Sequence, residues 1–147
     1  MIEFYDFPRH PGQFAGNIPV AADTVIDSGA LTAVNADGNA LNAASTVTGF
    51  VAGRCQGGAD NAGGDAGDEH ALIERGVFEL GQADSNPVTK AHIGKMVFAI
   101  TPDSVAHTGT CRAGILLGFS TSNLPIVDTT MASLSTAADI AAAIAAI

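Results

Sequence analysis

An acidic, glycine-rich stretch at residues 56–70 holds the side chains most suggestive of chemistry. Its carboxylates are Asp60, Asp65, Asp68 and Glu69, and carboxylate oxygens are the ligands that calcium takes in proteins. The spacing of a helix-loop-helix calcium site is missing, because an alanine and a glycine stand where the next two ligands should follow Asp60. We therefore expect a mobile, solvated surface loop and no metal site, with a loosely bound ion as the alternative.

The histidines offer little toward catalysis or metal binding. They are His10, His70, His92 and His107. No two of them are three or four residues apart, as paired metal ligands on one element are. The sequence also lacks the nucleophile elbow, the zinc-protease helix motif and the phosphate loop. We expect surface imidazoles, no catalytic residue and no cofactor, so the chain is predicted not to be an enzyme. A triad assembled from distant strands is the alternative.

Two cysteines, Cys55 and Cys111, have mirrored flanks, Ala-Gly-Arg before the first and Arg-Ala-Gly after the second. This symmetry would suit neighbouring strands. Two half-buried free thiols or a disulfide would both fit, and a cytosolic origin favours free thiols.

The charge balance excludes several partners. Six Lys and Arg residues against fifteen Asp and Glu residues give a net charge of −9. So few basic residues cannot neutralise a run of phosphates or bind an anionic bilayer, so neither nucleic acid nor membrane is an expected partner. No apolar run approaches the ~20 residues that a bilayer requires. The first residues also lack the basic-then-apolar plan of a signal peptide, which predicts a protein made in the cytoplasm.

Short extended runs separated by turn residues fill residues 21–130. Thr46–Ala52 and Lys95–Ile100 are rich in β-branched and aromatic residues, and Asp37-Gly38 is a hairpin turn signal. We predict an all-β domain, a small β-barrel or sandwich. With no Trp, one Tyr and 17 glycines, its core should be lean.

The two ends of the chain differ from this β region. Residues 1–20 predict an extended arm, because prolines interrupt a cluster of aromatic anchors at Phe4, Tyr5, Phe7 and Phe14. The arm would lie across another subunit or fold back on its own domain.

Residues 131–147 predict a lead-in and a short C-terminal α-helix. The isoleucines Ile140, Ile144 and Ile147 fall on one helical face. We expect this stripe to pack between subunits or on its own barrel, with a frayed tail as the alternative.

Several stretches, taken in order, resemble the capsid decoration (cement) proteins of tailed bacteriophages, of the kind found in Mu-like and related phages. They comprise an early hairpin, a Gly- and Asp-rich loop, a following strand, a second hairpin and a closing strand, at residues 29–40, 58–68, 75–80, 92–106 and 112–119. Both ends of the chain depart from the family. So does the segment Leu124–Asp128, which lacks the Trp that family members often carry in their last strand.

This resemblance implies a non-catalytic virion protein on the capsid exterior. Such a protein commonly forms a homotrimer, and its partners would be the major capsid protein and further copies of itself. The alternative is a virion-displayed β domain that binds a host surface or carbohydrate. The shortage of exposed aromatic residues makes a sugar-stacking groove harder to build.

Overall fold

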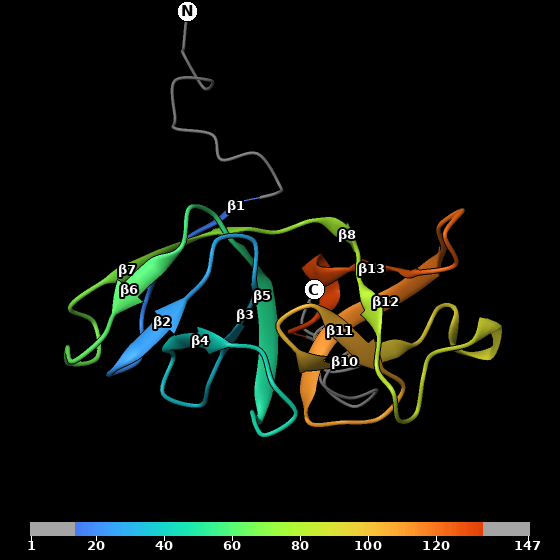
Figure 1. Cartoon of the computed structure of the whole chain (residues 1–147), viewed down its shortest axis with the longest axis horizontal. Helices are drawn as coiled ribbons and strands as arrows, with labels where there is room; N and C mark the ends of the chain where they lie inside the picture. The colour runs from blue at the N-terminus through green and yellow to red at the C-terminus, as the bar shows by residue number, and fades with distance from the viewer. Residues whose placement is uncertain (1–13, 134–147) are drawn as a thin grey trace, which may run out of the picture.

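The computed structural model describes residues 14–133, and nearly all regular structure in this range is β-strand (Figure 1). The predicted all-β class is confirmed. The elements in chain order are β1 (Phe14–Pro19), β2 (Thr24–Ile26), β3 (Leu31–Val34), β4 (Ala40–Asn42), β5 (Gly49–Cys55), β6 (Ala59–Asn61), β7 (His70–Glu74), β8 (Val77–Glu79), β9 (Gly81–Gln82), the 3₁₀ helix η1 (Lys90–His92), β10 (Met96–Thr101), β11 (Ser104–Ala106), β12 (Cys111–Phe119), β13 (Pro125–Asp128) and the 3₁₀ helix η2 (Thr129–Met131).

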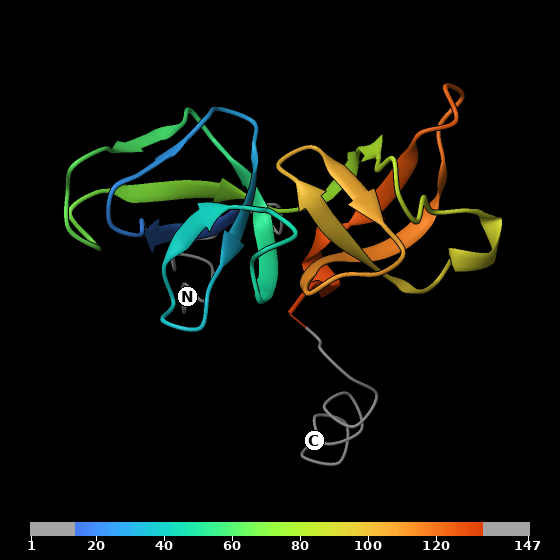
Figure 2. The ribbon, with the colours of Figure 1, turned by 60° about the horizontal axis from the view of Figure 1, so that its bottom comes forward.

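The strands gather into two groups that lie side by side (Figure 2). The main sheet runs in the order β1-β7-β5-β12-β10-β11-β9, with β3 and β4 branching from β5, and β13 and β8 branching from β12. A second sheet pairs β2 with β6. The groups meet where β5 and β12 pair in parallel over a short register. Among the described residues the strands do not close into a single barrel.

The core is lean, as the composition predicts. The larger cluster spans both groups of strands and includes Leu31, Val51 and Leu116, whereas the smaller one lies in the first group around Ile26 and Ile73. The largest fully buried side chains in the described range are aliphatic. Three aromatic residues are partly buried and pack against the larger cluster from outside: Phe50, Phe78 and Phe119.

The first predicted hairpin forms because its turn is held by side-chain hydrogen bonds. Between β3 and β4, the Asn35 side-chain oxygen accepts hydrogen bonds from the backbone N–H groups of Asp37 and Asn39. Gly38 adopts a φ of 82°, a conformation that glycine reaches without strain. The turn therefore fixes the antiparallel register of β3 and β4.

Residues 71–80 have the composition of one continuous strand, but they form parts of two strands, β7 and β8. β7 pairs with β1 and β5 in the first group, whereas β8 pairs with β13 in the second. The chain crosses between the groups at Gly76, whose N–H and C=O are both bound by the Thr129 hydroxyl at 3.1 and 2.8 Å. This anchoring separates two strands that periodicity alone would join.

The last residues of the predicted N-terminal arm belong to the main sheet. Residues 14–19 form the edge strand β1, which pairs antiparallel with β7, with the backbone of Phe14 opposite Glu74. The described domain therefore begins within the predicted arm. The only proline in β1 is Pro19, its last residue. The earlier residues of the strand therefore keep the backbone N–H groups that donate hydrogen bonds in a sheet.

Candidate assembly surface

The acidic loop, predicted to be a mobile surface loop, makes several side-chain hydrogen bonds in the structure. Part of it is the strand β6, which ends at the buried Asn61. The Asn61 side-chain nitrogen donates to the backbone carbonyls of Ala21 and Asp65 at 3.0 Å each, with a longer contact of 3.5 Å to Val20. A buried amide that binds several carbonyls fixes its surroundings, so this one side chain ties the loop to the start of β2.

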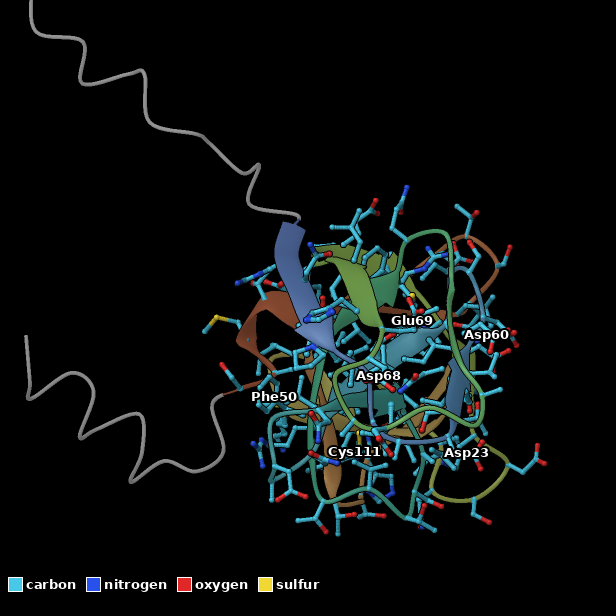
Figure 3. The ribbon with its side chains drawn as sticks, turned by 90° about the vertical axis from the view of Figure 1, so that its left-hand side faces the viewer. Asp23, Phe50, Asp60, Asp68, Glu69 and Cys111 are labelled. Atoms are coloured by element: carbon cyan, nitrogen blue, oxygen red, sulfur yellow. The ribbon has the colours of Figure 1, made fainter. Side chains whose placement is uncertain are left out.

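The carboxylates of this region cap backbone N–H groups, and they are spread across the loop rather than converging (Figure 3). Asp23 accepts from Gly63 at 2.8 Å, and Asp68 accepts from Asp65 at 2.9 Å. Within residues 14–133, no group of three or more His, Cys, Asp or Glu side chains is placed to hold a metal ion.

Two of the four histidines form a stacked pair that the sequence did not suggest. The rings of His92 and His107 are 4.5 Å apart and 8° from parallel. His92 Nδ1 accepts a hydrogen bond from the Thr89 N–H at 2.9 Å and so caps η1. In a neutral imidazole with this bond, the ring proton is on Nε2. His70 is exposed, as predicted, and His10 lies outside the described residues. The pair holds the η1 loop against the end of β11.

Cys55 and Cys111 are both free and buried. They do lie on neighbouring strands, but Cys111 pairs with Gly49 at the opposite end of β5 from Cys55. Gly49, which lies opposite Cys111, and Cys55 are six residues apart along β5, or about 20 Å. This separation is far beyond the reach of a disulfide. Burial raises the pKa of both thiols, although a backbone hydrogen bond opposes this at each and the Arg112 charge opposes it at Cys111. Both thiols should be unreactive.

A groove of about 480 Å³ lies beside β9, β10 and β11. Its walls carry hydroxyl and amide side chains with a single carboxylate, Asp84, and no aromatic ring among the described residues. These groups can donate and accept hydrogen bonds but hold no pair suited to acid-base catalysis.

A second, more apolar groove of about 260 Å³ lies between the two groups of strands. We call it the interlobe groove, and its lining residues come from β1, β3, β5, the link after β7, and the end of the described chain: Ile18, Val34, Phe50, Val51, Ala52, Arg75, Thr129, Thr130 and Ser133. Phe50 and both ends of the described chain lie on the same side of the molecule (Figure 3). Chain residues that are far apart in sequence therefore build one contact surface where the termini leave the domain.

Most of the predicted contact residues fall outside the described range. Phe4, Tyr5 and Phe7 precede it, and Ile140, Ile144 and Ile147 follow it; Phe14 is placed only through its backbone in β1. Sequence reasoning missed Phe50 and Arg75 as groove residues. Phe50 sits in a predicted strand and Arg75 is one of only six basic residues, but neither signal indicates a groove.

Comparison of the chain with protein-family models, with curated proteins and with solved structures gives no match. No helix within residues 14–133 is long and apolar enough to span a bilayer. The described residues therefore form an all-β protein with a groove whose lining comes from both groups of strands.

Proposed function

We propose that this chain is a structural protein that decorates and stabilises the outside of a tailed-bacteriophage capsid. In this proposal it binds the major capsid protein as a homotrimer and carries no catalytic residue. It is made in the cytoplasm of the bacterial host and ends on the virion exterior.

One observation supports the proposal: most of the stretches on which the resemblance rests form the strands and hairpins that the sequence predicts for them, in the same order. The early hairpin corresponds to β3 and β4, the second hairpin to β10 and β11, and the closing strand to the nine-residue β12. The strand after the acidic loop corresponds to β8, although it is shorter than the resemblance implies. Agreement between local sequence and element order supports a common scaffold.

The surface properties suit a protein that acts through contacts. With a net charge of −9 it has no basic footprint for nucleic acid. A lean core means that contacts between copies would add an appreciable share of the stability. Contacts repeated around a capsid lattice would also gain by multivalency.

Co-sedimentation with capsids tests the proposal. Purified chain is mixed with empty heads of the phage whose genome encodes it, and the bound amount is measured against concentration. We expect saturation at a fixed ratio to the major capsid protein and a higher melting temperature of the heads. Absence of binding at micromolar concentrations contradicts the proposal. Deleting residues 2–14 should lower the occupancy, since the deletion removes the aromatic anchors.

The 480 Å³ polar groove favours a second candidate function, recognition of carbohydrate on a host surface. Hydroxyl and amide groups such as those of Ser85, Asn86 and Thr108 can bind sugar hydroxyls, although the groove offers no ring for stacking. A glycan array separates the two functions: saturable binding that is lost in Asn86→Ala would favour carbohydrate recognition.

A further inference from the structure

We infer that the interlobe groove receives the acidic aromatic segment Glu3–Phe7 of a neighbouring copy of the chain. The inference deepens the proposed function and rests on it for the presence of neighbours. It names both sides of the contact that would hold the trimer together.

The groove has the size and lining for an aromatic side chain. Its walls are mainly aliphatic and aromatic, from Ile18, Val34 and Phe50, and its volume is about 260 Å³. An apolar cavity of about 150 Å³ is enough to bind benzene. One phenyl or phenol ring would fit, with space left for part of a backbone. The segment Glu3–Phe7 supplies three rings in five residues.

Arg75 gives the groove a charge preference. Its Nη2 donates to the Thr130 carbonyl at 3.4 Å. Its Nε is buried and finds no hydrogen-bond partner among the described residues. A buried donor without an acceptor is energetically unfavourable, so an incoming acceptor is favoured. Glu3 and Asp6 flank the aromatic residues with carboxylates, and an arginine beside apolar walls also favours a ring through cation–π contact.

The link between the segment and β1 is the reason for choosing a neighbour over the same domain. Pro8 and Pro11 predict extended backbone at Phe7 and His10. An extended link of six residues that continued the line of β1 would carry the segment about 19 Å beyond Phe14, away from Ile18 in the groove of the same copy. A segment from one copy in a groove of the next is a head-to-tail contact, which forms a closed ring when the rotation matches the symmetry.

Disulfide trapping without capsids tests this contact directly. Ile2→Cys places a thiol beside the segment, and Ser133→Cys places one at an exposed position of the groove. Cys55 and Cys111 are buried, so they provide little background. The Ile2→Cys chain carries a mass tag, is mixed with untagged Ser133→Cys chain and is oxidised gently.

We expect a mixed covalent dimer of tagged and untagged chains, and a ladder ending at trimer when both substitutions are in one chain. The inference is overturned if no mixed dimer forms, or if the doubly substituted chain closes only on itself as a monomer. A mixed dimer without capsid binding would contradict the proposed function and support this contact. Capsid binding without a mixed dimer would support the proposed function and contradict this contact.

A charge substitution gives an independent measurement. Arg75→Gln should raise the concentration at which trimers dissociate by roughly tenfold, since it removes the cation that faces the segment. Lys95→Gln changes the net charge equally at an exposed position outside the groove and should leave dissociation unchanged. Far-ultraviolet circular dichroism checks that both variants are folded, and equal dissociation of the two contradicts the inference.

Discussion

Replacing Asn61 with alanine should destabilise the domain far more than the same change at a half-buried asparagine. The Asn61 amide is buried and donates to two carbonyls at 3.0 Å, with a third at 3.5 Å. The two shorter bonds contribute roughly 1 kcal/mol each, and the carbonyls left buried without donors add to the loss. We expect a total of about 2–3 kcal/mol.

This loss should be visible in thermal unfolding. For a chain of this length, 1 kcal/mol lowers the melting temperature by about 2–4 °C, so Asn61→Ala should lower it by between about 4 and 12 °C. The matched control is Asn42→Ala. Asn42 also donates its side-chain amide to a backbone carbonyl, that of Val25 at 2.8 Å, but it does so near solvent. Its loss should be about 0.5 kcal/mol.

Hydrogen exchange locates the effect. In the wild-type protein the N–H groups of Gly63, Gly64 and Gly67 are bonded within the acidic loop or to its neighbours, and they should exchange slowly. Asn61→Ala should release them, whereas Asn42→Ala should not. Equal melting temperatures for the two variants, or fast exchange in the wild type, would refute the reasoning that one buried amide anchors the loop.

Three further results are expected. Thiol reagents should label neither Cys55 nor Cys111 in the native protein and both after denaturation, because both are buried and free. Because burial raises the pKa of both thiols above the ordinary value near 9, the thiols of the unfolded state ionise first as the pH rises. Stability should therefore fall above about pH 9, and replacing both cysteines with alanine should flatten this slope. Gly114→Ala should disrupt the pairing of β12 with β13, since a Cβ at φ 141° would collide with the carbonyl of Asp128. Gly38→Ala places its Cβ in open space and should cost only about 1 kcal/mol of backbone strain. Circular dichroism melting curves of the two variants measure the difference in stability.

Local patterns predicted the elements that depend on near neighbours. The β3–β4 hairpin follows from the Asp37-Gly38 turn, and β10 follows from a run of β-branched and aromatic residues. The all-β class follows from the repetition of such runs. These features need only contacts within a few residues, which the order of amino acids records directly.

The acidic loop shows where local reasoning stops. Its composition is typical of mobile surface loops, and composition does not reveal that Asn61 reaches carbonyls about forty residues earlier in the chain. The stacking of His92 on His107 and the split of residues 71–80 at Gly76 likewise depend on partners brought close only by folding.

By itself, the sequence determined the β class, the lean core, the acidic charge and the exclusion of phosphate-binding chemistry, since these depend on composition and short-range spacing. Only the tertiary structure decided that Ile18, Phe50, Arg75 and Ser133 form one groove. The reason is geometric: those residues span more than a hundred positions, and no pattern along the chain encodes which distant strands will meet.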